Sequence, residues 1–84
     1  MQEKNLNIEK IGRRIRELRE ILNLKQTEFA KSLNIAQPYL SVLENGERNS
    51  FTIEILLKLV EKYNVNINWL LTGEGRVFLN DYKE

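Results

Sequence analysis

The sequence predicts an all-α domain of five helices, on the basis of three observations. Apolar residues recur at spacings of three and four along most of the chain, which is the period of a helix with one buried face. The chain has 84 residues, of which 42% are apolar and one is Pro, so it should form one small domain with a core. Asn or Gly follows the apolar stretches, where helices commonly end. No linker or repeat divides the sequence.

The composition removes several classes of function. The chain contains no Cys and no His, which excludes disulfides, thiolate metal sites and histidine acid–base chemistry. No pair of carboxylates is placed for catalysis, so we expect neither an enzyme nor a cofactor or metal ion. No apolar run approaches the ~18 residues of a membrane span, and residues 1–10 lack a signal-peptide core. A cytoplasmic protein without a membrane partner is therefore expected.

The net charge of +1 is uninformative, but the charge is unevenly distributed. Residues 10–31 contain seven basic and three acidic side chains, whereas residues 32–84 contain five basic and seven acidic ones. A basic first third is consistent with a face that binds nucleic acid. It is also consistent with an ordinary solvated helix of mixed charge, so the charge alone does not decide between them.

The first helix is expected from about residue 8 to residue 22. Asn7 or Asn5 is the candidate N-cap, and the helix should end near Asn23. Its apolar stripe consists of Ile8, Ile11, Ile15, Leu18 and Leu22.

Two short helices joined by a tight turn follow. The second helix is expected over residues 26–33, and Asn34 then takes the turn because Asn tolerates the left-handed conformation. The third helix should start near Gln37, since Pro38 is acceptable only in a first turn, where its missing N–H needs no partner. Gly46 marks its end.

The fourth helix should be capped by Thr52 and end at Asn64. Its predicted buried stripe consists of Ile53, Leu56, Leu57, Val60 and Tyr63. A short fifth helix over residues 66–71 closes at a Gly-Glu-Gly sequence, and an apolar cluster over residues 77–79 follows it.

Three stretches carry a resemblance to a known family. They are Gln26-x-x-Phe29-Ala30 with Leu33-Asn34-Ile35, then Leu40-Ser41-x-Leu43-Glu44-Asn45-Gly46, and VNINWLLTGEG at residues 65–75. Together they resemble the Cro/CI-type (XRE-like) helix-turn-helix family of phage and bacterial repressors. The resemblance implies a lambda-repressor-like domain over residues 1–75 whose third helix lies in the major groove of DNA, followed by a C-terminal tail over residues 76–84.

A helix in the major groove reads base edges with residues near its N-terminus. The predicted base contacts are Gln37, Pro38, Ser41 and Val42. Gln37 can form a bidentate pair with adenine, Pro38 and Val42 offer apolar surface to a thymine methyl, and Ser41 can donate or accept. For Gln37 the alternative is an ordinary polar residue at the start of a helix.

Phosphate contacts are expected from helix ends and from the loop after the third helix. The predicted set is Arg19, Lys25, Gln26, Tyr39, Asn45, Arg48, Asn49 and Ser50. Tyr39 alternatively packs over apolar neighbours. The resemblance also implies an internal salt bridge between Arg19 and Glu44 that orients Arg19 toward a phosphate. Replacing Glu44 should then weaken DNA binding without changing the preferred sequence.

Two helices lack the usual cap residue. Lys25 and Ala36 stand where relatives carry Ser or Thr, and a missing cap costs about 1 kcal/mol. We therefore expect poor side-chain capping at the starts of both helices of the helix-turn-helix.

An exposed apolar patch is expected near the C-terminus, where it would serve a homodimer. The predicted dimer contacts are Trp69, Leu70, Val77, Phe78 and Leu79. A two-fold dimer would place the two third helices about 34 Å apart and require a pseudo-palindromic operator. The alternatives are that Trp69 fills the core and that the tail folds back over its own domain.

These observations favour a sequence-specific regulator of transcription, most simply a repressor, that binds double-stranded DNA as a homodimer. The alternative is a protein-interaction module of the same fold, such as an antitoxin subunit whose apolar tail engages a toxin.

Overall fold

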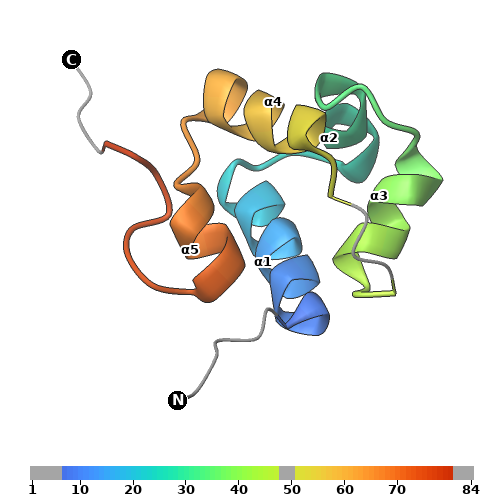
Figure 1. Ribbon diagram of the computed structural model, residues 1–84. Coiled ribbons are helices and arrows are strands. Elements are labelled where there is room, and N and C mark those ends of the chain that lie inside the picture. Colours follow the sequence, from blue (N-terminus) through green and yellow to red (C-terminus); the bar gives the residue numbers. More distant parts are fainter. Residues whose placement is uncertain (1–6, 48–50, 81–84) are drawn as a thin grey trace.

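The described part of the chain, residues 7–47 and 51–80 of the computed structural model, contains five α-helices and no strands (Figure 1). The helices are α1 (Ile8–Ile21), α2 (Gln26–Ser32), α3 (Gln37–Glu44), α4 (Ile53–Tyr63) and α5 (Ile67–Thr72). The predicted all-α class with five helices is therefore confirmed. In the ranges that the structure describes, no helix has the length and apolarity needed to cross a bilayer.

The helix boundaries follow local chemistry. The side chain of Asn7 caps α1 by accepting from the backbone N–H of Lys10 at 3.0 Å, and Thr52 Oγ1 caps α4 by accepting from Ile55 at 3.1 Å. Asn34 and Asn64 adopt the left-handed conformation, with φ of +62° and +59°. Asn carries this conformation at lower cost than most residues. The predicted turn at Asn34 and the predicted helix end at Asn64 are confirmed.

The predicted lack of side-chain caps on α2 and α3 is also confirmed. Neither Lys25 nor Ala36 caps its helix with a side-chain hydrogen bond. Helix α2 is helped by Glu28, whose carboxylate accepts from the backbone N–H of Lys25 at 2.9 Å. Helix α3 instead begins with Pro38 in its first turn, where proline removes a donor that would otherwise lack a partner.

Helix α1 lies between α5 and α3 and forms the centre of the domain (Figure 1). Its Ile11, Ile15 and Leu18 are almost fully buried. Helix α2 packs against α3, and the rings of Phe29 on α2 and Tyr63 on α4 lie 5.5 Å apart between centroids. The other core residues are Ala30, Leu33, Leu40, Leu43, Ile55, Leu59, Val65, Trp69 and Leu70.

The close approach of α1 to α3 depends on Gly12, which sequence reasoning did not single out. A Cβ atom at this position would overlap the carbonyl oxygen of Leu43. It would also lie 3.0 Å from the carbonyl oxygen of Glu44 and 3.0 Å from the backbone nitrogen of Gly46. All three neighbours are backbone atoms at the end of α3. Gly12 therefore sets the distance between α1 and the end of α3.

The predicted buried face of α4 is wrong in part. Ile53 is 82% exposed and Leu57 is 51% exposed, whereas Ile55 and Leu59 fill the core. Leu56 and Tyr63 are partly buried against it, as expected. Apolar residues stand at so many positions of this helix that two overlapping stripes fit a helical period. Only the packing of α4 on the domain selects between them.

Residues 77–79 of the tail pair with their own domain, as the alternative interpretation expected. Val65 and Phe78 form an isolated antiparallel bridge, and the N–H of Asn66 donates to the carbonyl of Val77 at 2.8 Å. Val77 and Phe78 are partly buried against the core. Trp69 and Leu70 are 7% and 0% exposed, so they are core residues of α5 and are not available to a second subunit. Among the five predicted dimer contacts, only Leu79 is mostly exposed.

Candidate nucleic-acid interface

Helices α2 and α3 form a rigid pair joined by a hydrogen-bonded turn. The N–H of Asn34 donates to the carbonyl of Lys31, and that of Ile35 donates to Ala30, both at 3.0 Å. Buried Leu33 and Leu40 anchor the two sides of the turn. Because the turn is fixed by backbone bonds and core packing together, the orientation of α3 relative to α2 is set by the fold.

The outer face of α3 brings together the predicted base contacts. Leu40, Leu43 and Glu44 point inward and are buried. The positions left on the outside are Gln37, Pro38, Ser41, Val42 and Asn45, which recur at helical spacing. Pro38 and Asn45 are exposed, and the other three are partly exposed. The structure therefore places the four predicted base contacts and the predicted phosphate contact Asn45 on one accessible face, whereas their contacts with DNA remain a prediction.

Glu44 is the one charged residue buried in the described ranges, with 4% exposure. Its carboxylate accepts two hydrogen bonds from the guanidinium of Arg19, from Nε to Oε2 at 2.7 Å and from Nη2 to Oε1 at 3.1 Å. Such bidentate arginine–carboxylate pairs are strong and geometrically specific. The implied internal salt bridge is present, and it joins α1 to the last residue of α3.

The pair also fixes the charge of Arg19. The hydrogen bonding of Arg19 to the Glu44 carboxylate raises the pKa of Arg19 above its ordinary value, against a smaller opposing effect of burial. Because the pKa of Arg19 is raised on folding, its charged form stabilises the folded protein. That contribution is fully present below the ordinary arginine pKa and is lost only as the pH rises through the raised pKa. The arginine charge is therefore constant throughout the neutral range. Arg19 Nη1 also donates to the carbonyl of Leu24 at 3.2 Å.

A chain of side-chain hydrogen bonds leads from Glu44 to the outer face of α3. Gln26 Nε2 donates to Glu44 Oε1 at 2.9 Å, and Gln37 Nε2 donates to Gln26 Oε1 at 2.5 Å. A carboxylate can only accept, so Gln26 must turn its amide nitrogen toward Glu44 and its oxygen toward Gln37. Sequence reasoning assigned separate roles to Gln26 and Gln37. It missed this connection because nothing in their spacing shows that the two side chains meet.

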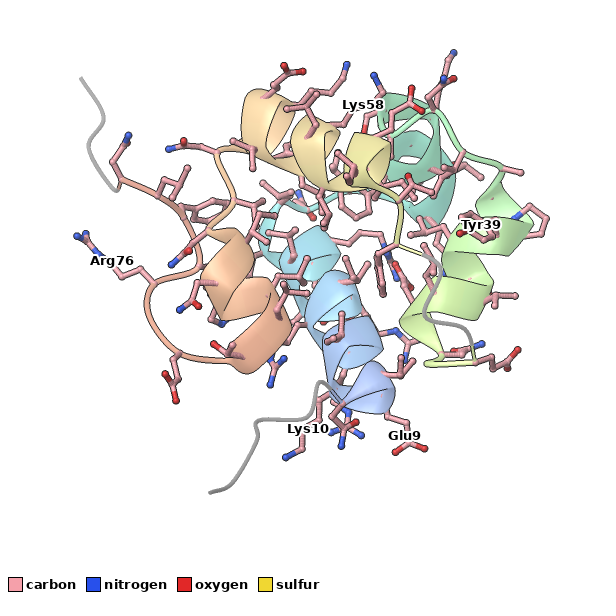
Figure 2. All side chains as sticks on the ribbon, in the orientation of Figure 1. Glu9, Lys10, Tyr39, Lys58 and Arg76 are labelled. Atoms are coloured by element: carbon pink, nitrogen blue, oxygen red, sulfur yellow. The ribbon has the colours of Figure 1, made fainter. Side chains whose placement is uncertain are left out.

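The remaining predicted phosphate contacts differ in their exposure to solvent. Lys25 is exposed at the start of α2, and Asn45 is exposed at the end of α3. Tyr39, labelled on α3 in Figure 2, is partly buried and packs against the core, as its alternative interpretation expected. Arg48, Asn49 and Ser50 lie outside the described residues.

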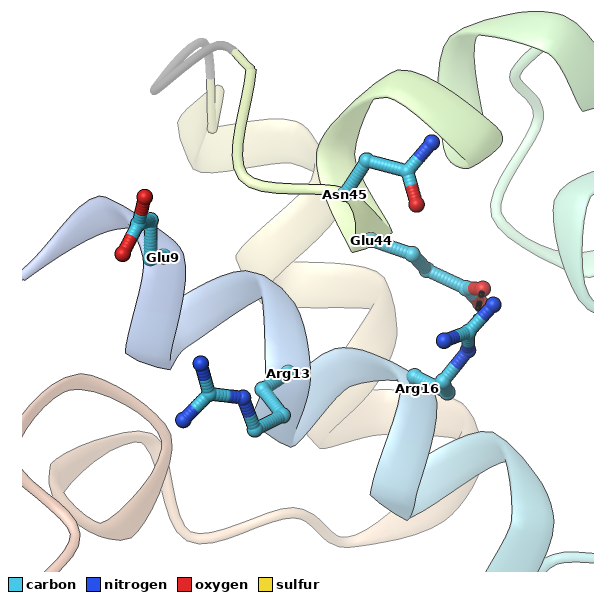
Figure 3. A pocket seen from close by; sticks show the side chains of 5 residues that line it. All are labelled: Glu9, Arg13, Arg16, Glu44 and Asn45. Atoms are coloured by element: carbon cyan, nitrogen blue, oxygen red, sulfur yellow. Dashed lines mark ion pairs between the residues drawn. The ribbon is translucent and has the colours of Figure 1, made fainter.

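A small pocket of about 290 Å³ lies where the first half of α1 meets the end of α3 (Figure 3). Its walls are Glu9, Arg13, Arg16, Glu44 and Asn45. This pocket could not be predicted from the sequence, because it depends on the α1–α3 distance that Gly12 permits. Within the described ranges, no group of three acidic side chains is arranged to hold a metal ion.

Comparison with known proteins agrees with this geometry. Residues 12–76 match a family model described as a helix-turn-helix domain. The chain belongs to the Cro/CI-like, XRE-type helix-turn-helix family.

Three curated relatives illustrate this helix-turn-helix family. The chain is 36% identical over 72 residues to the ImmF control region 10 kDa protein of Bacillus phage phi105, covering 86% of this chain and 79% of that protein. It is 38% identical over 64 residues to the HTH-type transcriptional regulator DdrOP3 of Deinococcus deserti, covering 76% of the chain and 49% of that regulator. It is 34% identical over 73 residues to a propionyl-CoA carboxylase regulator of Cereibacter sphaeroides, covering 87% of the chain. The chain spans only 16% of this last regulator and about half of DdrOP3.

Two solved structures share the helix-turn-helix fold. The restriction-modification controller protein C.AhdI from Aeromonas hydrophila superposes with a TM-score of 0.66 at 30% identity, covering 76% of this chain and 96% of that one. SinR, a master regulator for biofilm formation solved in complex with DNA, superposes with a TM-score of 0.64 at 28% identity. The superposition with SinR covers 71% of this chain and 95% of SinR.

Proposed function

We propose that this helix-turn-helix domain is a sequence-specific DNA-binding regulator of transcription that acts as a repressor with α3 in the major groove. The observation that carries the proposal is the accessible face of α3, whose first residue is held in place by partly buried hydrogen bonds. The resemblance to a phage control-region protein and to a regulator solved with DNA supports it. Steric exclusion of polymerase from a promoter requires nothing more than occupancy of the site.

The hydrogen bonds within the protein define what Gln37 offers to a base. One N–H of its amide is directed to Gln26, which leaves the second N–H as a donor and the amide oxygen as an acceptor. Adenine presents N7 as an acceptor and the N6 amino group as a donor in the major groove, which matches this pair. Gln37 is therefore the residue we assign to an adenine, with Pro38, Ser41 and Val42 contacting the neighbouring base pairs.

The phosphate contacts would flank the reading face of α3. Arg19 and Gln26 lie beside Glu44, near the start of α2, and Asn45 follows Glu44 at the end of α3. Lys25 adds an exposed positive charge at the start of α2. These contacts supply affinity and register without reading sequence.

Selection of bound sequences from random duplex DNA at about 150 mM salt tests this proposal, because non-specific binding weakens as salt rises. We expect enrichment of a symmetric site with an invariant adenine in each half. Gln37→Ala should lower the discrimination for that adenine by about 1–3 kcal/mol and leave the other positions readable. Lys62→Ala, which removes an exposed charge from α4, is the control. Failure to enrich any sequence with the wild-type protein would overturn the proposal.

The protein is proposed to bind its operator as a homodimer, because a single α3 reads too few base pairs to select a site. The exposed apolar residues of α4 support this proposal and replace the buried residues of α5 as the candidate contact. Ile53 and Leu57 are one helical turn apart and mostly exposed, and such neighbouring exposed apolar side chains are a surface that a second subunit can cover.

Leu57→Asp is expected to convert a dimer into a monomer, as measured by sedimentation equilibrium, and to remove cooperative binding to two half-sites. Lys62→Asp places the same charge on an exposed polar position of α4 and should leave association unchanged. A wild-type protein that is monomeric at all concentrations and on its operator would contradict the proposed dimer.

The antitoxin alternative rested on an apolar tail available to a toxin. Val77 and Phe78 instead pack against the chain's own core, which leaves Leu79 as the one mostly exposed residue of this apolar cluster.

A further inference from the structure

The pocket between α1 and α3 is not used by the proposed readout of bases. Figure 3 shows Arg13 between Glu9 and Arg16 along α1, with Glu44 reaching toward Arg16 from the end of α3 and Asn45 next to Glu44. In Figure 2, Glu9 lies on the side of α1 nearer α3, whereas Lys10 points away from it. The volume of about 290 Å³ accommodates one tetrahedral anion with some of its water.

One positive charge of this pocket is unpaired among the described residues, and the other is only loosely paired. Glu44 already accepts short hydrogen bonds from Arg19 and Gln26. Arg16 Nε stands 3.9 Å from Glu44 Oε1, and the side chain of Arg16 is 53% exposed. Among the described residues, Arg13 forms no ion pair and is exposed. With Glu44 neutralised by Arg19, the remaining charges that line the pocket are the two guanidinium groups of Arg13 and Arg16 and the single carboxylate of Glu9. The pocket is therefore net positive.

The position of the pocket indicates its ligand. Arg16 lies one helical turn before Arg19 on the same side of α1, and Asn45 directly follows Glu44. Arg19 is itself one of the residues proposed to contact a phosphate, so the pocket continues that set of contacts along α1. Guanidinium groups and a side-chain amide are suitable donors for phosphate oxygens.

We propose that Arg13, Arg16 and Asn45 form a phosphate-binding pocket that takes a backbone phosphate of the bound DNA. The proposal rests on the proposed DNA binding, and it extends the contact surface from the helix-turn-helix to the first half of α1. The contact is independent of sequence. It therefore adds affinity at every site, including non-specific DNA.

The test is the salt dependence of DNA binding by the double variant Arg13→Ala/Arg16→Ala. Each phosphate contact contributes a slope of about −0.9 to a plot of log K against log salt. The slope of the variant should be smaller in magnitude by the equivalent of one to two phosphate contacts. This decrease should be the same for the selected site and for unrelated duplex DNA. Arg13→Lys/Arg16→Lys keeps both charges and should retain most of the slope. Lys62→Ala, which removes one exposed positive charge outside the pocket, is the control. Thermal unfolding of each variant shows whether it is folded.

An unchanged slope in the folded double-alanine variant would overturn the DNA source of the phosphate. Titration of the free protein with inorganic phosphate, followed by NMR of the arginine side chains, distinguishes a second source. Saturable binding there, combined with an unchanged slope, would assign the pocket to a free phosphate compound. Because the slope is also measured on unrelated duplex, this test succeeds or fails independently of whether a specific operator is found.

Discussion

Replacing Glu44 with Ala is expected to lower the free energy of unfolding by about 3 kcal/mol and to abolish specific DNA binding. Removing one partner of a buried ion pair typically costs about 3–5 kcal/mol, since the other charge is left uncompensated. The side chain of Arg19 retains 15% exposure, so water can partly solvate the freed guanidinium, and the lower end of that range applies. Urea unfolding of the variant and of the wild type measures the difference.

The double variant Arg19→Met/Glu44→Leu separates stability from function. Replacing both members of a buried pair with apolar residues of similar volume is often neutral for stability. We expect this variant to unfold close to the wild type and still to bind DNA poorly, because Gln26 has lost the carboxylate that orients it. Normal DNA binding by the double variant would show that the ion pair has no part in positioning α3.

Glu44→Gln is a finer change with a different expected result. Its amide can donate to Gln26 as well as accept from it, so both orientations of the Gln26 amide become available. Gln37 then loses its fixed orientation, and the preference for adenine at its base pair should relax. The sequence alone predicted that changes at Glu44 leave sequence preference intact. The hydrogen bonds from Glu44 through Gln26 to Gln37 reverse that expectation, and binding-site selection with this variant decides between the two.

Local chemistry made much of the fold predictable. Asn7 and Thr52 cap their helices because each side-chain oxygen accepts a hydrogen bond from the backbone N–H three residues later, which has no partner within the helix. Pro38 dictates the start of α3, and Asn34 and Asn64 adopt the left-handed turns that their side chains tolerate. The outer face of α3 was predictable for the same reason. Once Leu40 and Leu43 are buried, the helical period determines which residues of this short helix lie on the outer face.

The features that were not predictable depend on how separate elements approach one another. Both Ile53 and Ile55 fit an apolar stripe on α4, and only the packing of the helix shows that Ile55 is inside. The fold-back of the tail depends on backbone pairing between Val65 and Phe78, which has no periodic signal. The meeting of Gln26 with Gln37 and the pocket beside Arg16 likewise require the distances between helices. These distances are set by contacts such as the one at Gly12.

Gly12→Ala is expected to destabilise the domain by about 2 kcal/mol, although alanine is the better helix former. Helix propensity alone would favour the substitution by about 1 kcal/mol. The new Cβ would overlap the carbonyl oxygen of Leu43, and overpacking typically costs about 1–3 kcal/mol and occasionally more. The overlap outweighs propensity here because the obstructing atoms belong to the backbone of α3 and cannot rotate away as a side chain would.

The same substitution should weaken DNA binding by more than its effect on stability, because the domain can relieve the overlap only by moving the end of α3 away from α1. That movement separates Glu44 from Arg19 and shifts the reading face relative to Gln26. Glu17→Ala, at an exposed position of α1, is the matched control and should change stability by less than about 0.5 kcal/mol. Urea unfolding and binding to the selected operator measure both effects. A Gly12→Ala variant more stable than the wild type would show that α1 and α3 can separate at no cost, and normal operator binding by it would show that their distance does not govern readout.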